Sequence, residues 1–153
     1  KIHLFRFAQG DEAYDETRTI ERGSAPATFD ARGVRVGLSV CYDVRFPELY
    51  RALRDCALFL VPSAFTWTTG SAHWHLLLRA RAVENQAYVL AAAQGGTHAN
   101  GRRTFGHSML VDPWGEIVAE RSDDGQGVVV GDVDPARIAE VRGKLPAHAH
   151  RVL

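Results

Sequence analysis

Two short apolar runs flank a helical segment in the middle of the chain, and this alternation restricts the fold more than any other feature. Residues 57–65 (ALFLVPSAF) and 87–93 (AYVLAAA) are apolar at nearly every position, which is typical of strands buried on both faces. Between them, residues 72–86 (AHWHLLLRARAVENQ) are rich in good helix formers and contain no glycine or proline. The pattern predicts a layered α/β domain.

Hairpin signals interrupt this alternation. Residues 27–40 (ATFDARGVRVGLSV) predict a hairpin that turns at 30–33, and residues 112–115 (DPWG) predict a second tight turn. Because hairpins interrupt the strand–helix rhythm, we expect a mixed sheet rather than a purely parallel one. The other expected elements are a strand at 1–7, a loop over 8–24, a helix over 46–56, a polar turn over 66–71, an exposed loop over 94–103, strands at 104–112, 116–120 and 127–134, and a helix over 135–145 that begins at Asp134 and Pro135.

Bulk composition excludes several classes of partner. Eighteen basic residues balance eighteen acidic ones in 153 residues, so no global field favours nucleic acid or an anionic membrane surface. The apolar runs are too short to span a bilayer, and no signal-peptide pattern is present. We therefore expect a cytoplasmic, globular protein in which both cysteines are free thiols.

Cys41 lies where the apolar run 37–40 (GLSV) gives way to an amphipathic helical segment. A thiol at this position faces the N-terminal amides of the next helix, which favour thiolate and can stabilise an oxyanion. Free cysteine is also among the most buried residue types, so packing is the alternative interpretation. Cys56 lies on the apolar face of the following helix, where packing is the better interpretation.

The seven histidines identify neither an obvious base for Cys41 nor a metal site. His73 and His75 are two residues apart on a helix and therefore face different directions. His148 and His150 lie in the tail, where weak chelation is possible and a solvated terminus is the simpler interpretation. No third or fourth ligand occurs at a suitable spacing, so we expect neither metal nor cofactor.

The segment 38–50 (LSVCYDVRFPELY) resembles the nucleophile segment of the nitrilase, or carbon–nitrogen hydrolase, superfamily. The resemblance continues through residues 61–65 (VPSAF), 69–89 and 106–120 (GHSMLVDPWGEIVAE), and so covers nearly the whole chain. It implies an α-β-β-α sandwich, a Glu-Lys-Cys triad supported by a second glutamate, and hydrolysis of amides, nitriles or carbamoyl groups through a thioester. It also implies a homodimer or higher homo-oligomer that associates through a sheet edge close to the helix carrying Arg79, Arg81 and Glu84, three residues expected to form structural ion pairs.

Carried onto this chain, the resemblance makes Lys1, in 1–5 (KIHLF), the catalytic lysine and Cys41 the nucleophile. Glu16 falls where the supporting glutamate is expected, with Glu12 and Glu21 as nearby alternatives and a solvated loop carboxylate as the competing interpretation. The general-base glutamate belongs to an upstream segment that this sequence does not contain. The resemblance therefore implies that residues 1–153 are the C-terminal portion of a single carbon–nitrogen hydrolase domain.

Several further residues are expected to form the binding site. The backbone N–H of Tyr42 is the expected oxyanion donor, and Arg45, one turn after Cys41, is expected to hold a substrate carboxylate unless it pairs with Glu48. Phe65 and Thr66, with Trp67 beside them, follow the next apolar run, where pocket walls are expected. Trp114, in the second turn, is expected to pack.

Residues 91–98 (AAAQGGTH), followed by Arg102 or Arg103, resemble most closely the branch that hydrolyses deaminated glutathione. Residues 65–70 (FTWTTG) are also similar to ω-amidases, which act on α-keto-acid ω-amides. Both resemblances imply a small amide substrate that carries carboxylates. The alternatives are a nitrilase or N-carbamoyl hydrolase of the same superfamily, or a non-catalytic carboxylate-binding or interaction domain if the upstream glutamate is lacking.

Overall fold

A computed structural model describes residues 1–10, 12–123 and 125–152. The helices are η1 (Glu16–Arg18), η2 (Cys41–Arg45), α1 (Pro47–Ala52), α2 (Trp67–Asn85) and α3 (Pro135–Lys144). The strands are β1 (Arg6–Gln9), β2 (Glu12–Asp15), β3 (Ala27–Ala31), β4 (Val34–Leu38), β5 (Leu58–Leu60), β6 (Tyr88–Ala91), β7 (Gly95–Thr97), β8 (Arg103–Phe105), β9 (Ser108–Val111) and β10 (Ile117–Arg121). No helix in these ranges is long and apolar enough to cross a membrane.

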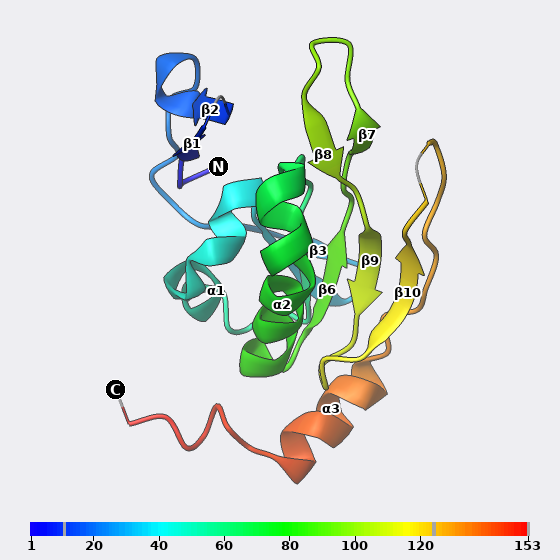
Figure 1. The fold of residues 1–153 in the computed structure, drawn as a ribbon. Helices are drawn as coiled ribbons and strands as arrows, with labels where there is room; N and C mark the ends of the chain where they lie inside the picture. The colour runs from blue at the N-terminus through cyan, green and yellow to red at the C-terminus, as the bar shows by residue number, and fades with distance from the viewer. Residues whose placement is uncertain (11, 124, 153) are drawn as a thin grey trace.

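A six-stranded mixed sheet forms the centre of the molecule, with the order β10-β9-β6-β5-β4-β3 (Figure 1). Strands β4, β5 and β6 are parallel to one another, and the antiparallel pairs are β3 with β4, β6 with β9, and β9 with β10. This arrangement confirms the predicted α/β class and the predicted mixed sheet. The hairpin predicted at 27–40 and the turn at 112–115 are also confirmed, the turn being closed by the N–H of Gly115 donating to the carbonyl of Asp112 at 2.9 Å.

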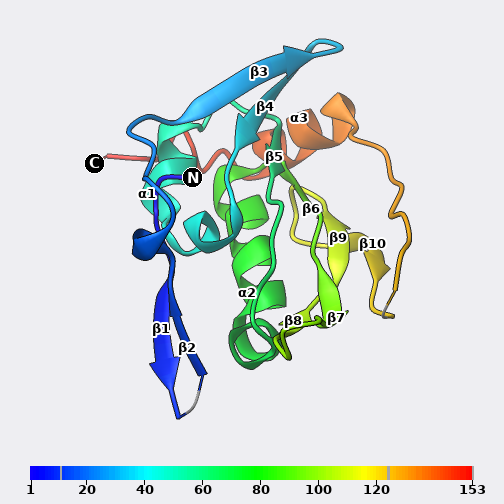
Figure 2. The ribbon, with the colours of Figure 1, turned by 90° about the horizontal axis from the view of Figure 1, so that it is seen from above.

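Alternate side chains along the central strands face two different helical layers. Val89 and Val111 face α1 and α2 and pack with the fully buried Trp74 and Leu78 of α2. On the opposite face, Tyr88 and Leu110 pack with Ile138 of α3. The view in Figure 2 shows α1 and α2 beside one face of the sheet and α3 beside the other. This side-chain alternation is the period of two that strand geometry imposes.

The N-terminal segment differs from the prediction of a strand over 1–7 and a loop over 8–24. The strand begins only at Arg6, and β1 and β2 form an antiparallel hairpin, followed by the short helix η1. Residues 1–3 are not in a ladder, because the backbone N–H groups of Ile2 and His3 donate to the side chain of Asp43 instead. That partner is distant in sequence, so a local pattern could not reveal it.

The long helix begins earlier than expected, and the predicted polar turn at 66–71 is wrong. Thr66 is the N-cap of α2, and its hydroxyl oxygen accepts from the N–H of Thr69 at 3.2 Å. Position 70, in the first turns of α2, requires glycine, because a Cβ there would come within 2.3 Å of the Cβ of Phe105. This glycine therefore marks close packing rather than a helix break.

Two other segments were predicted wrongly. The expected exposed loop at 94–103 contains β7 and leads into β8, and these two strands pair as a hairpin. The strand expected at 127–134 is absent from the described structure, and Val128 and Val130 are each 81% exposed. Apolar side chains that remain in solvent gain little from strand formation, which explains why the apolar run alone misled the prediction. The helix expected over 46–56 and the strand over 57–65 are present but shorter, whereas α3 begins as predicted, with the Asp134 carboxylate accepting from the N–H of Ala136 at 2.8 Å.

Candidate active site

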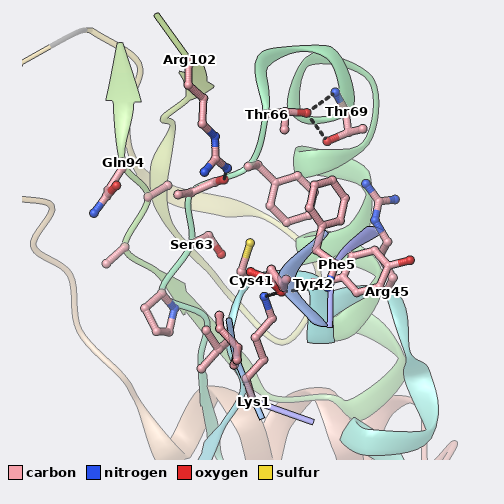
Figure 3. A pocket seen from close by; sticks show the side chains of 18 of the residues that line it. Lys1, Phe5, Cys41, Tyr42, Arg45, Ser63, Thr66, Thr69, Gln94 and Arg102 are labelled. Atoms are coloured by element: carbon pink, nitrogen blue, oxygen red, sulfur yellow. Dashed lines mark hydrogen bonds and ion pairs between the residues drawn. The ribbon is translucent and has the colours of Figure 1, made fainter. Parts of the chain in front are cut away.

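Cys41 occupies the junction between β4 and η2, as the sequence pattern predicts. Its backbone φ is +52°, in the left-handed region that few residues other than glycine adopt, and its N–H donates to the carbonyl of Pro62 at 2.9 Å. Strained backbone of this kind occurs preferentially at functional sites. The thiol is partly exposed and points into a cavity (Figure 3).

Asp43 connects the cysteine turn to the start of the chain. Its side chain is 2% exposed and accepts from the backbone N–H groups of Val40 at 3.0 Å, Ile2 at 3.2 Å and His3 at 2.8 Å. The Nδ1 atom of His3 lies 2.9 Å from the same carboxylate. These contacts fix residues 1–3 beside the Cys41 turn and so determine where Lys1 can reach.

Lys1 and Glu16 form an ion pair at the edge of this cavity. The Lys1 side chain is 9% exposed, and the Glu16 carboxylate also accepts from the backbone N–H of Phe5 at 2.7 Å. Glu12, one of the two alternatives, instead contacts the hydroxyls of Tyr14 and Thr68. The structure therefore places Glu16, and not Glu12, against Lys1.

Arg45 lies at the end of η2 and faces the same cavity (Figure 3). Its guanidinium lies over the rings of Phe65 at 5.2 Å and Tyr42 at 5.9 Å, and it contacts Nδ1 of His73 at 3.3 Å. Desolvation lowers the pKa of Arg45, although the nearby Tyr42 and Cys41 act in the opposite direction. No carboxylate of the described residues forms an ion pair with this guanidinium, so the expected alternative pairing with Glu48 does not occur there.

The cavity has a volume of about 630 Å³ and brings most of the predicted site together. The expected catalytic and binding residues that line it are Lys1, Glu16, Cys41, Tyr42, Arg45, Phe65 and Thr66. Thr66, however, uses its hydroxyl to cap α2, which makes it part of the wall rather than a free donor. Trp67 does not line the cavity and packs instead against Phe105 and Arg103.

Comparison with known proteins identifies the family. Residues 1–143 match the carbon-nitrogen hydrolase family. The chain belongs to this family. It is 42% identical to a deaminated glutathione amidase of Dictyostelium discoideum, with 100% of this chain and 54% of that protein aligned. It is also 42% identical to human omega-amidase NIT2, with 95% of this chain and 54% of that protein aligned.

A solved structure shows the same fold. The NitFhit protein of C. elegans superposes with a TM-score of 0.91 at 44% identity, over 99% of this chain and 37% of that one. The fold is therefore that of a nitrilase-superfamily protein, as the resemblance implied. The chain spans about half the length of the curated relatives described above.

Cys56, Arg79, Arg81 and Trp114 lie outside the residues that line the cavity. Cys56 is buried, both cysteines are free, and desolvation raises the pKa of the Cys56 thiol, so the packing interpretation is confirmed. Arg81 pairs with Glu84 at 2.7 Å as expected, whereas Arg79 donates to the carbonyl of Gly115. Trp114 is half exposed, so the prediction that it packs is wrong.

Sequence reasoning missed Asp43 as the residue that fixes the N-terminal segment. An acidic residue in the first turn after Cys41 was the available signal, but its partners lie about 40 positions away. Arg102 was noted only as a branch feature. The structure places it in the cavity wall, with its guanidinium donating to the carbonyl of Ala64 at 2.7 Å and lying over the ring of Tyr14.

Proposed function

We propose that this chain provides the cysteine-bearing part of an amidase that hydrolyses a small, carboxylate-bearing amide to an acid and ammonia or an amine. One observation carries the proposal: the thiol of Cys41, the Lys1–Glu16 pair and the guanidinium of Arg45 face a single cavity. A nucleophile, a buried cation beside it and a second cation for substrate binding are what acyl transfer from a charged amide requires. The names of the relatives support the same reaction class.

In the proposed mechanism a general base takes the proton of the Cys41 thiol, and the resulting thiolate attacks the amide carbon, forming an S–C bond and a tetrahedral oxyanion. The Lys1 ammonium and the N–H of Tyr42 stabilise this oxyanion; Tyr42 is in the first turn of η2, where N–H groups have no acceptor within the helix. Collapse of the intermediate breaks the C–N bond, a protonated base donates a proton to the leaving amine, and a thioester remains. Water activated by the same base then attacks the thioester and releases the acid and the thiol.

We propose that the base in this mechanism is a glutamate other than those found in the described cavity wall. Glu16 is the only carboxylate among the described residues that line the cavity, and it already binds Lys1 and the N–H of Phe5. These two contacts direct the carboxylate at the lysine side chain and at the adjoining backbone, which suits a positioning role. We therefore assign Glu16 to holding Lys1 in place, and we assign the base to a glutamate of the remaining part of the hydrolase domain.

The substrate class follows from Arg45. A half-buried guanidinium that stacks on aromatic rings and lacks a carboxylate partner among the described residues is suited to bidentate binding of a substrate carboxylate. Arg102, across the cavity, provides a second positive charge. Deaminated glutathione and α-keto-acid ω-amides both carry an amide together with carboxylates. We therefore propose that the enzyme acts on a substrate of this kind and that it does so in the cytoplasm.

Replacement of the nucleophile tests the proposal. In the full-length protein, Cys41→Ala is expected to abolish ammonia release from α-keto-acid ω-amides and hydrolysis of deaminated glutathione, while leaving the circular dichroism spectrum unchanged. Cys56→Ala is the matched control, since that thiol is buried away from the cavity, and it should retain turnover. Full activity of the Cys41→Ala protein would show that Cys41 is not the nucleophile.

The same cavity would also suit a non-catalytic carboxylate-binding domain. The two functions are distinguished by the Cys41→Ala protein and the wild-type protein together. If both bind the amide with the same affinity and neither releases ammonia, the binding function is correct and the amidase proposal fails.

We further propose a homodimer that forms along α2 and the adjacent turn at 112–115. Leu76 is 67% exposed, and Val83 of the same helix lies against Gly115, beside the half-exposed Trp114. Exposed apolar side chains that adjoin in this way are typical of a protein interface. Leu76→Glu is expected to convert the dimer to a monomer in light scattering, whereas an unchanged mass would place the interface elsewhere.

A further inference from the structure

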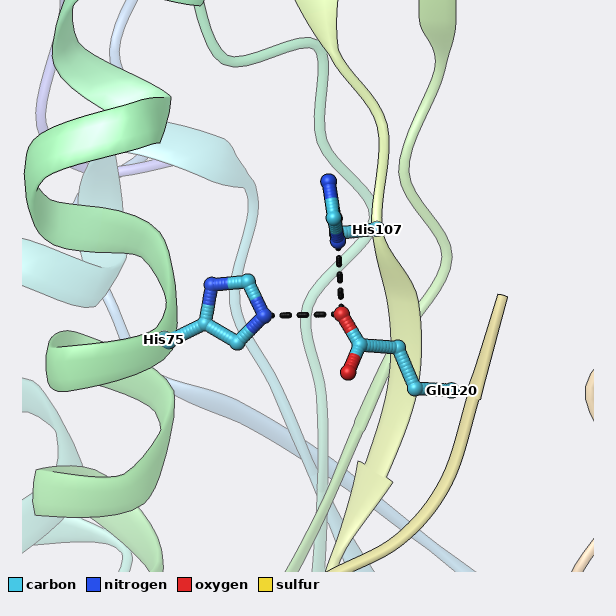
Figure 4. A group of neighbouring side chains, drawn as sticks. All are labelled: His75, His107 and Glu120. Atoms are coloured by element: carbon cyan, nitrogen blue, oxygen red, sulfur yellow. Dashed lines mark hydrogen bonds and ion pairs between the residues drawn. The ribbon is translucent and has the colours of Figure 1, made fainter. Parts of the chain in front are cut away.

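A cluster of three metal-ligating side chains lies outside the Cys41 cavity. His75 lies in α2, His107 directly precedes β9, and Glu120 lies in β10, and their donor atoms all lie within 4.8 Å of one another. Figure 4 shows both imidazole rings directed at the carboxylate. We propose that these three residues form a binding site for a divalent transition-metal ion of the zinc type.

The donor geometry is close to what such an ion requires. Nε2 of His75 lies 2.7 Å and Nδ1 of His107 lies 2.6 Å from the same oxygen of Glu120. A tetrahedral zinc ion with bonds of about 2.0–2.1 Å holds its ligand atoms about 3.3 Å apart. The distance between each nitrogen and that oxygen therefore has to increase by only about 0.6 Å. The metal ion would then take the place of the protons in these two hydrogen bonds.

The surroundings hold the His107 side chain in place. His107 has a left-handed backbone, with φ of +59°, and follows Gly106, with φ of +72°. Its ring stacks on Phe105 with centroids 4.2 Å apart, and its carbonyl accepts from Nε1 of Trp74 at 2.9 Å. A ligand fixed by its backbone and by a stacking partner loses little freedom when it binds a metal.

The choice of ion follows from the ligand types and the exposure of the cluster. Two imidazoles and one carboxylate suit zinc and its neighbours in the transition series, whereas magnesium and calcium prefer oxygen ligands alone. The side chains are 37%, 20% and 27% exposed for His75, His107 and Glu120, so solvent can reach the site. A water molecule would complete the coordination as the fourth ligand.

The proposed site would join α2 to the outer strands β9 and β10. It is also next to the Cys41 cavity, since Ser108, the neighbour of His107, lines the cavity wall and its hydroxyl accepts from the N–H of Ala93 at 2.9 Å. The inference does not depend on the proposed amidase function, and its test needs no turnover.

Calorimetric titration with zinc tests the site in the full-length protein. All measurements use the Cys41→Ala background, because a thiolate is itself a strong zinc ligand. After removal of metal with a chelator, we expect one zinc ion per chain at pH 7.5, with a Kd of about 1 µM or tighter, and no binding of magnesium. His75→Gln, His107→Asn and Glu120→Gln should each weaken zinc binding by more than about 10-fold, and asparagine at 107 suits the left-handed backbone.

The histidines of the tail provide the control. A His148→Gln, His150→Gln double variant removes two closely spaced histidines that lie outside the proposed site. It should bind zinc with unchanged affinity. X-ray absorption of the zinc-loaded Cys41→Ala protein should show nitrogen and oxygen ligands with two imidazoles and no sulfur, a readout that does not require the variants to fold. The proposal is overturned if zinc does not bind, if the three single variants bind as well as their parent, if the tail variant loses binding, or if sulfur is coordinated.

Discussion

Asp43→Asn is the substitution that tests most sharply how the site is assembled. The buried carboxylate accepts from the N–H of Val40 through one oxygen, and from the N–H groups of Ile2 and His3 through the other. Asparagine must direct its NH2 group at one of these two sets of donors. At least one part-buried N–H is then left without its acceptor, which costs about 1–3 kcal/mol, and the bonds that remain are no longer charge-assisted. We expect the free energy of unfolding to fall by about 2–4 kcal/mol.

Urea unfolding followed by tryptophan fluorescence measures this loss, since the fully buried Trp74 reports on the core. Asp30→Asn is the matched control, because Asp30 is an exposed hairpin residue whose ion-pair partner in the described part of the chain is the exposed Arg35; it should change stability by less than about 0.5 kcal/mol. Asp43→Asn should also lower kcat by roughly 10²-fold with little effect on KM, because Lys1 is no longer held in place. An unfolding free energy within about 0.5 kcal/mol of the wild type would refute the account of Asp43.

Three further predictions concern substrate binding, the core and pH. Arg45→Ala should reduce kcat/KM for a carboxylate-bearing amide by about 10–100-fold and leave an uncharged amide little affected, as parallel steady-state assays would show; equal losses for both would contradict carboxylate binding. Leu78→Ala should lower the free energy of unfolding by about 2–5 kcal/mol in urea, since this side chain is fully buried, whereas Val128→Ala at an exposed position should cost far less. Desolvation raises the pKa of Glu120, but hydrogen bonds from His107 and His75 outweigh it and hold the pKa below its ordinary value. In metal-free buffer, the stability that Glu120 contributes should therefore be present near pH 7 and be lost as pH falls through the lowered pKa, so that Glu120→Gln differs from wild type at pH 7 and converges with it in acid; a constant difference would contradict this.

Features that depend on neighbouring residues in the sequence were predictable. The position of Cys41, the turn at 112–115 and the start of α3 at Asp134 each follow from a few adjacent residue types, and the structure has all three. The alternation of strands and helices, together with the hairpin signals that interrupt it, was likewise enough to predict the mixed sheet.

Features that depend on distant contacts were not predictable. Gly70 lies inside α2 because Phe105 packs against it, and the run containing Val128 and Val130 does not pair although its composition favours a strand. Likewise, Asp43 and the cluster of His75, His107 and Glu120 depend on side chains from separate elements, whose proximity the spacing along the chain does not reveal. The residues of the Cys41 cavity were predicted mainly from the family resemblance rather than from local pattern.

Covalent labelling tests most directly the proposed role of Cys41 as the nucleophile of an amidase. Chloroacetamide, a small electrophilic amide, is added in limiting amounts to the full-length protein, and peptide mass spectrometry at each step gives the labelled fraction of Cys41 and of Cys56. We expect activity to fall in proportion to label on Cys41 and to reach zero at one label per chain, with Cys56 unlabelled because it is buried and burial raises its pKa. Full activity in protein that is completely labelled at Cys41 would contradict this role.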